Sequence, residues 1–174
     1  MRSAIDSTDE TLYSGAIHSD VDLEIGGKGE LTVVSENNNG IHSKDDLQVK
    51  NLTLLVACID NSLKGNDSVE IEGGNTTLIA SGGDCIKTSN SDISEKGNQR
   101  GSISIVGGTH NLYAACDGID AAYNATVDDS TTVLNIYTDK YSNYSKEVSA
   151  NSSDTNYMVP LLQHSWFLPA SCPL

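Results

Sequence analysis

A motif of about 23 residues recurs along the middle of the sequence. Residues 16–25 read AIHSDVDLEI, residues 40–49 read GIHSKDDLQV and residues 62–71 read SLKGNDSVEI. Each copy has an apolar anchor near its start, and successive anchors are 24, 22, 23 and 33 residues apart: Ile17, Ile41, Leu63, Ile86 and Ile119. A repeat of this length is typical of solenoid proteins, in which each copy packs against its neighbours.

Each copy also carries two short runs with the two-residue alternation of β-strands. The first is an apolar pair such as Leu47/Val49, and the second follows a polar or glycine-containing break, as in residues 53–56. Gly-Gly pairs at 26–27, 73–74 and 107–108 predict turns. We therefore predict an all-β fold: a right-handed parallel β-helix of about five coils of roughly 23 residues, with three short strands per coil. A leucine-rich repeat has a similar period, but its Leu/Asn framework is absent.

The same pattern divides the chain into three parts. Residues 13–139 form the predicted solenoid, in which a polar insertion over residues 91–100 explains the long step. Residues 1–12 are a polar N-terminal tail. The last 15 residues hold all the Trp, Phe and Pro of the chain: Trp166, Phe167, Pro160, Pro169 and Pro173. Residues 140–174 are therefore either a cap over the apolar end of the solenoid or a non-native tail.

The charge of the chain limits its partners. Ten Lys and Arg against 24 Asp and Glu give a formal net charge of −14, which excludes a basic nucleic-acid-binding surface. No apolar run is long enough for membrane insertion, and residues 1–20 show no signal peptide. The cysteines have no metal-ligand spacing, and we expect Cys58, Cys85 and Cys116 to be small buried side chains.

Four sequence segments, in order, resemble a known family. Residues 39–47 (NGIHSKDDL), 64–74 (KGNDSVEIEGG), 82–90 (GGDCIKTSN) and 117–121 (DGIDA) are similar to motifs of the bacterial carbohydrate-binding parallel β-helix proteins. The resemblance covers residues 13–139 and implies a fold like that of polysaccharide lyases, calcium binding, and an exported or surface-attached location. Cys85 and Ser62 stand where the family prefers Gly, and His18 and His42 stand where it has Lys. Family members carry further N-terminal coils, so the chain resembles a partial copy.

Stacked coils place equivalent residues in rows, and two rows are rich in oxygen ligands. Two positions before the anchor stand Asn39, Asn61, Asp84 and Asp117. Four or five positions after it stand Asp45, Asp46, Asp67 and Asn90. Stacked carboxylates repel unless neutralised, and Ca²⁺ prefers six to eight oxygens. We predict Ca²⁺ ligation by Asp45, Asp46, Asp67, Asp84, Asp117, Asn61 and Asn90. The alternatives are an Asn/Asp turn ladder for the first row and a solvated turn for the second.

A third row follows the anchor by one position and is partly basic: His18, His42, Lys64, Lys87 and Asp120. We expect it to receive the carboxylates of a uronic-acid polymer, whereas the alternative is mutual neutralisation with the acidic turns. The predicted carbohydrate-binding residues are His42, Lys44, Lys64, Lys87, Asp120 and Tyr113, the last as an outward residue that stacks on a sugar. His110 is expected to be a hydrogen-bonded core histidine.

Three functions are compatible with these patterns. The first is calcium-assisted, non-catalytic binding of an acidic plant polysaccharide such as polygalacturonate, by a monomer at the cell surface or outside the cell. The second is a pectate-type polysaccharide lyase, which needs a cation for the uronate carboxylate and a base for the C5 proton. Arg2 and Arg100 are the only arginines available to such an enzyme. The third is a structural or adhesive surface protein, or an inactive fragment. No G-x-S-x-G, H-E-x-x-H or P-loop motif is present, so no catalytic residue is assigned.

Overall fold

A computed structural model of the chain describes residues 14–138, and over this range it contains thirteen β-strands and no helix. One sheet has five strands, in the order β1 (Gly15–Ser19), β4 (Asn39–Ser43), β7 (Leu63–Gly65), β10 (Ile86–Thr88) and β12 (Ile119–Asp120). The second sheet runs through β2 (Leu23–Gly26), β5 (Asp46–Lys50), β8 (Ser68–Glu72), β11 (Ser102–Ala114), β9 (Asn75–Ala80), β6 (Thr53–Cys58) and β3 (Glu30–Val34). Its eighth strand, β13 (Asn124–Thr138), pairs with β11.

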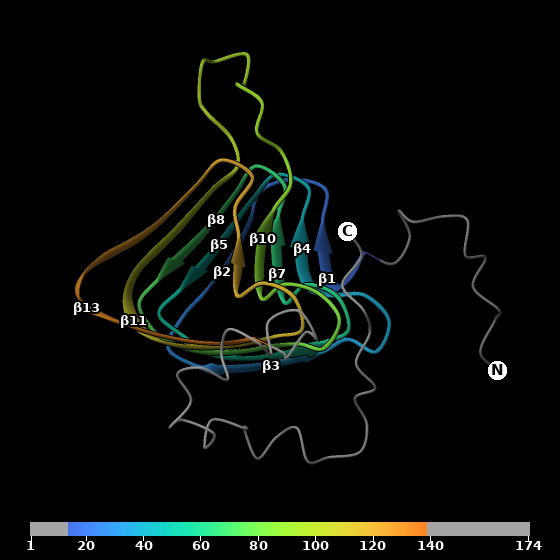
Figure 1. The fold of residues 1–174 in the computed structure, drawn as a ribbon, viewed down its shortest axis with the longest axis vertical. Helices are drawn as coiled ribbons and strands as arrows, with labels where there is room; N and C mark the ends of the chain where they lie inside the picture. Colours follow the sequence, from blue (N-terminus) through green and yellow to red (C-terminus); the bar gives the residue numbers. More distant parts are fainter. Residues whose placement is uncertain (1–13, 139–174) are drawn as a thin grey trace, which may run out of the picture.

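The strands stack into a parallel β-solenoid of about five coils, as the sequence predicts. In Figure 1 each coil traces three sides around a common interior. The strands β1, β4, β7 and β10 form one side, and β2, β5 and β8 form the second. The third side holds β3, and β11 bends from the second side onto the third, which joins both into one sheet.

The anchor residues form the predicted ladder. Backbone pairing aligns Ile17 with Ile41, and then continues through Leu63 and Ile86 to Ile119. The three central members of the ladder have no exposed surface. Burying each aliphatic side chain of this size stabilises a fold by roughly 1.5–3 kcal/mol, so the ladder fixes the register in which the coils stack.

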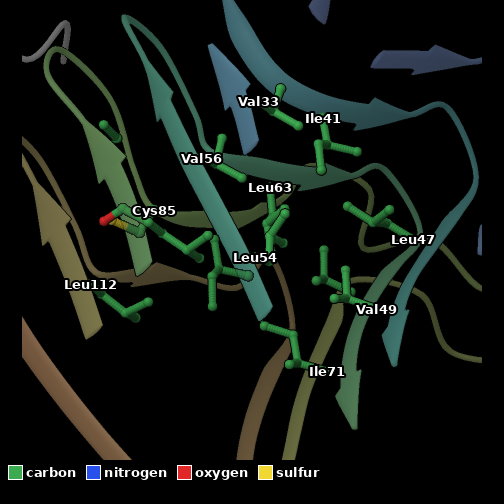
Figure 2. Close-up of a cluster of buried hydrophobic side chains, with 14 of the residues drawn as sticks. Val33, Ile41, Leu47, Val49, Leu54, Val56, Leu63, Ile71, Cys85 and Leu112 are labelled. Atoms are coloured by element: carbon green, nitrogen blue, oxygen red, sulfur yellow. The ribbon is translucent and has the colours of Figure 1, made fainter. Parts of the chain in front are cut away.

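The core lies inside the coils and receives side chains from all three sides. Figure 2 shows Ile41 and Leu63 from the five-stranded sheet meeting Leu47 and Val49 of the second side and Leu54 of the third. All five are at most 1% exposed. Strands such as β5, β6 and β8 bury alternate residues, so a chain with few large aliphatic residues still fills a continuous core.

The last two coils differ from the prediction of three short strands. β11 and β13 each run without interruption over positions that form two separate strands in the earlier coils. Gly107 and Gly108, with φ values of 68° and 89°, lie within β11 where the chain bends from the second side onto the third, beside a register shift against β13. Glycine adopts these positive φ values without steric strain, so the chain changes direction at the predicted place without ending the strand.

The segment of residues 91–100 is a loop. It lies between β10 and β11 and projects from the corner of the coils, as the yellow-green loop in Figure 1. Ile93 and Gln99 form an antiparallel bridge, and the Ser94 amide donates to the Asn98 carbonyl at 2.8 Å. The predicted tail of residues 1–12 and the segment 140–174 lie outside the described residues. Between residues 14 and 138, no helix could cross a membrane.

The three cysteines expected to be small buried side chains are all buried, at 2%, 0% and 8% exposure for Cys58, Cys85 and Cys116. Cys58 and Cys85 are free thiols, as that expectation requires. Cys116 differs, because it is disulfide-bonded. Sequence spacing held no sign of this, since the pairing of cysteines depends on tertiary contacts.

Candidate functional site

The five-stranded sheet has a different set of candidate residues at each end. Asp45, Asp46, Asp67 and Asn90 follow β4, β7 and β10, whereas Asn61, Asp84 and Asp117 precede β7, β10 and β12. The predicted metal ligands are therefore divided between two separate corners of the coils.

The insertion lies over the first corner and forms a groove of about 890 Å³ with it. Six carboxylates line this acidic groove: Asp22, Asp45, Asp46, Asp67, Asp92 and Glu95. Two basic side chains, Lys96 and Arg100, also line it. The structure thus brings the three predicted aspartates of this corner together, and it adds insertion residues that row arguments could not place.

Asp67 is the structural anchor of the acidic groove. Its Oδ2 is 2.6 Å from Arg100 Nε, and its Oδ1 accepts a hydrogen bond from Asn90 Nδ2 at 2.8 Å. Its backbone carbonyl accepts from the Gly101 amide at 2.6 Å. Only 14% of the Asp67 side chain is exposed, so these contacts fix the end of the insertion against the coils.

The other carboxylates of the acidic groove are less engaged. Asp46 Oδ1 accepts from Ser68 Oγ at 2.7 Å, and Asp22 Oδ1 accepts a long bond from the Asp46 amide at 3.4 Å. Oxygen atoms dominate the donor set, which suits a hard cation such as Ca²⁺. Within residues 14–138, however, no three Asp, Glu, His or Cys side chains already converge closely enough to hold a metal ion. Ligation would therefore require carboxylate rotation or contributions from backbone carbonyls and water.

At the opposite corner, hydrogen bonds link the coils through Asn and Asp side chains. Asn39 Oδ1 accepts from the Asn61 amide at 3.1 Å and from Asn61 Nδ2 at 2.8 Å. Asn61 Oδ1 accepts from the Asp84 amide at 3.1 Å, and Asp84 Oδ1 accepts from the Asp117 amide at 2.8 Å. These contacts are those of an Asn/Asp turn ladder, in which each side chain satisfies the backbone of the next coil.

Lys87 adds charge compensation to this ladder. Its Nζ lies 2.7 Å from Asp84 Oδ2 and 2.5 Å from Asp120 Oδ2. Partial burial lowers the pKa of Lys87, but the hydrogen bonds that Lys87 donates to Asp120 and Asp84 outweigh it and raise the net pKa. Asp117 stays outside these pairs, and its pKa is raised by burial and by the neighbouring Asp84 and Asp120 carboxylates. Lys87 is therefore a protonated bridge between two carboxylates.

The predicted basic row is aligned but largely neutralised. Pairing puts His18, His42, Lys64, Lys87 and Asp120 in one line across the sheet. Beside the row, Lys44 forms an ion pair with Asp20 at 2.6 Å. Lys64 has no ion pair among residues 14–138; the nearby acidic group is Asp60, whose pKa is raised by burial, a rise that the positive charge of Lys64 partly offsets. Lys64 is thus the member of the row best placed to attract an external anion.

His42 contributes little positive charge at neutral pH. It is 7% exposed, its Nδ1 is buried without a hydrogen-bond partner, and its Nε2 lies 3.4 Å from Asn66 Oδ1. Burial lowers the pKa of His42 to about 4, and the positive charges of Lys64, His18 and Lys44 contribute to this shift. Its ring packs 5.1 Å from that of His18, so this part of the row is a packed imidazole pair.

Tyr113 lies on the outer face of β11, where its ring stacks on Tyr137 with centroids 5.0 Å apart and planes 9° apart. One face of Tyr113 is therefore already covered. His110 is fully buried; its Nδ1 lies 3.0 Å from Thr76 Oγ1 and its Nε2 lies 2.8 Å from the Gly107 carbonyl oxygen. This confirms the prediction of a hydrogen-bonded core histidine.

Some site residues escaped the row analysis. Asp92, Glu95 and Lys96 belong to the insertion, which has no equivalent in other coils and hence no row position. Their signal was the charge of the insertion itself. Asp60 was missed because it belongs to none of the three rows. It directly precedes Asn61 in the sequence, and this position could have indicated that it lies near Lys64.

Comparison with known proteins gives two similarities. Residues 2–158 match the family model of carbohydrate-binding domain-containing proteins. Among solved structures, the gadolinium derivative of the polysaccharide lyase-like protein from C. thermocellum is similar, with a TM-score of 0.59 and 31% sequence identity. This similarity covers 79% of the chain and 56% of that protein, so the chain spans little more than half of its length. No curated protein matches the sequence.

Proposed function

Because the chain belongs to the family of carbohydrate-binding domain-containing proteins, we propose that its solenoid binds an acidic plant polysaccharide such as polygalacturonate, with Ca²⁺ and without catalysis. The observation that carries this proposal is the acidic groove, where six carboxylates face two basic side chains beneath the insertion. Within the groove, Asp67 and Arg100 already neutralise each other. Most of the negative charge is therefore left for an external cation.

The charge of the ligand explains why a cation is part of the proposal. A uronic-acid polymer is repelled by a chain of net charge −14, and the packed His42 and paired Lys87 and Lys44 offset little of that repulsion. Bound Ca²⁺ supplies positive charge between protein and sugar carboxylates. The similar solved structure is described as a gadolinium derivative, and gadolinium is another hard cation with a preference for oxygen ligands.

The proposed ligands are Asp45 and Asp46, with Asp67 and Asn90 orienting them from the next coils. Lys64 is the proposed direct contact for a sugar carboxylate, while His42, Lys87 and Asp120 of the same row and Lys44 beside it provide hydrogen bonds and shape. Tyr113, on β11 of the other sheet, is proposed as a separate sugar contact. Asn61, Asp84 and Asp117 form a second proposed cation corner whose oxygens already serve the turn ladder. We further propose that the protein acts as a monomer outside the cell or at its surface, as the family resemblance implies.

A polysaccharide lyase is the second candidate, because the similar solved protein is described as polysaccharide lyase-like. Lyase chemistry needs an unprotonated base near the C5 proton. Lys87 is a poor base, since its pKa is raised and it is held between Asp84 and Asp120. Arg100, the arginine of the described residues, is engaged with Asp67. These contacts favour binding over elimination.

The test is polygalacturonate binding measured by calorimetry in Ca²⁺, in Mg²⁺ and in EDTA at equal ionic strength. We expect binding in Ca²⁺ that is lost in EDTA and reduced at least tenfold by Asp45→Asn combined with Asp46→Asn. Glu30→Gln is the matched control, since it removes one exposed carboxylate from β3, away from the groove. Binding that persists in EDTA would remove calcium from the proposal. A rise in the absorbance of unsaturated uronate would replace it with the lyase.

A further inference from the structure

The insertion is a hairpin held together by its own hydrogen bonds. Ile93 and Gln99 form an antiparallel bridge, and inside it the Ser94 amide donates to the Asn98 carbonyl at 2.8 Å. The Gly97 amide donates back to the Ser94 carbonyl at 2.8 Å, and Gly97 has a φ of 82°, which glycine adopts without steric strain. The hairpin therefore keeps one shape without help from a ligand.

Contacts with the coils fix the base of this hairpin beside the acidic groove. The Arg100 amide donates to the Asp92 carbonyl at 3.1 Å, which joins the two ends of the insertion. Arg100 Nε is 2.6 Å from Asp67 Oδ2, and Thr88 Oγ1 donates to the Gly101 carbonyl at 3.0 Å. The hairpin projects from the corner of the coils in Figure 1, and its residues form one wall of the groove. The side chains of its tip are thus carried on a fixed support.

Lys96, at the tip of the hairpin, is the uncommitted cation of the groove. It lines the groove with six carboxylates, yet it forms no ion pair with any residue between 14 and 138. Arg100, the other basic residue of the lining, is held by Asp67. We propose that Lys96 contacts an ionised sugar carboxylate in the groove and makes the protein select uronic acids over their methyl esters. This inference rests on the proposed function.

The selection follows from the charge of the ligand. An ionised uronate carboxylate is attracted both by Lys96 and by a Ca²⁺ ion held at Asp45 and Asp46, whereas a methyl ester carries no charge and gains neither attraction. Lys96 comes from the hairpin and the two aspartates come from the coils, so two different segments of the groove hold the same group. Because Lys96 is exposed, its ion pair with the sugar should change affinity only severalfold.

Lys96 has opposite effects on the two proposed ligands. Its positive charge attracts the sugar carboxylate and repels Ca²⁺ in the same groove. Removal of this charge should weaken sugar binding, while Ca²⁺ affinity stays the same or rises. A substitution that disturbed the groove would weaken both. The two affinities, measured separately, therefore distinguish a direct contact from a structural role.

The test compares Lys96→Gln with Lys28→Gln, which removes an equally exposed and unpaired lysine from the turn between β2 and β3. Calorimetry measures the binding of oligogalacturonate in saturating Ca²⁺, and of Ca²⁺ alone. We expect Lys96→Gln to raise the sugar Kd about threefold and Lys96→Glu about tenfold, with Lys28→Gln equal to wild type. Wild type should prefer the free acid over a half methyl-esterified oligomer, and this preference should shrink in Lys96→Gln.

A charge-conserving exchange tests whether the position of the cation matters. Glu95→Lys combined with Lys96→Glu keeps the net charge of the tip and moves its ammonium by one residue, so this variant should bind sugar as weakly as Lys96→Gln or more weakly. Wild-type affinity in the exchanged chain would overturn the contact and leave only a general charge effect. Equal sugar affinities of Lys96→Gln and Lys28→Gln, or a parallel loss of Ca²⁺ affinity in Lys96→Gln, would overturn it too. Absence of binding by the wild type would instead overturn the proposed function itself.

Discussion

Replacing Asn61 with alanine tests whether the corner that precedes β7 is a turn ladder or a metal site. Asn61 is 3% exposed; its Nδ2 donates to Asn39 Oδ1 at 2.8 Å and its Oδ1 accepts from the Asp84 amide at 3.1 Å. The substitution removes both bonds. The Asp84 amide is then left buried without its acceptor, whereas Asn39 Oδ1 keeps the Asn61 amide as a donor.

The cost follows from these two losses. A buried donor without a partner costs about 1–3 kcal/mol, and the second bond adds about 1 kcal/mol. The free energy of unfolding should therefore fall by about 2–4 kcal/mol. In chains of this length 1 kcal/mol shifts the unfolding temperature by about 2–4 °C, so we expect a decrease of about 5–15 °C.

Urea unfolding followed by circular dichroism measures this change, with Asn75→Ala as the matched control. Asn75 begins β9 with an exposed side chain, so its replacement should change stability by less than about 0.5 kcal/mol. Both variants are compared with wild type in EDTA and in Ca²⁺. A turn ladder predicts the same loss in both solutions, because its bonds need no ion.

Two results would refute this reasoning. If Asn61→Ala is as stable as Asn75→Ala, the ladder bonds contribute nothing measurable. If Asn61→Ala is destabilised only in Ca²⁺, the residue contributes to ion binding, since a ligand raises stability through its affinity for the folded state. The second result would move the cation site to the Asn61, Asp84 and Asp117 corner.

Two further predictions concern charge. The pKa of His42 is about 4 in the folded chain and near 6.5 when unfolded. The stability that comes from keeping this imidazole neutral is therefore fully present above pH 6.5 and is lost as the pH falls toward 4. With an allowance for solvent screening, the free energy of unfolding of the wild type should fall by about 1–2 kcal/mol more than that of His42→Gln between pH 7.5 and 5, as measured by urea unfolding. Equal decreases in the two proteins would contradict the lowered pKa of His42. Lys87→Met leaves buried Asp84 without its cation and should cost about 1–3 kcal/mol, part of which Asp84→Asn in the same chain restores. Unchanged thermal unfolding of Lys87→Met would show that the pair does not stabilise the fold.

The coil architecture was predictable because one requirement repeats at every step. The anchors from Ile41 to Ile86 must face inward at the same point of each coil, and any slip by one residue would expose them. The rows of Asp45, Asp67 and Lys87 follow from that register alone. Gly107 and Gly108 mark a change of direction as predicted, but whether a strand ends at such a point or continues through it depends on pairing with neighbouring strands, which the sequence does not show.

Interactions that depend on contacts outside the repeat were not predictable. The row position of His42 suggested a surface base, but its burial follows from packing against His18 and the Asn66 side of the next coil. The acidic groove needed the insertion, whose path is fixed by the bond from Arg100 to Asp67. The position of a residue relative to the anchor specifies the direction of its side chain. Its charge state depends on its burial and on the side chains that pack against it.

The distribution of ion pairs links the fold to the proposed ligand. Much of the basic charge of residues 14–138 is already neutralised by carboxylates of the solenoid. Ion pairs with a carboxylate of the same or a neighbouring coil are formed by Lys44, Lys50, Lys87 and Arg100. Carboxylates of the acidic groove therefore repel one another from coil to coil, at a strand spacing of about 4.8 Å. A bound divalent cation would relieve that repulsion and, at the same spacing, present positive charge to a polymer of uronic acids. The repulsion among the carboxylates of the acidic groove is thus the property that would make a cation and an acidic polysaccharide bind together.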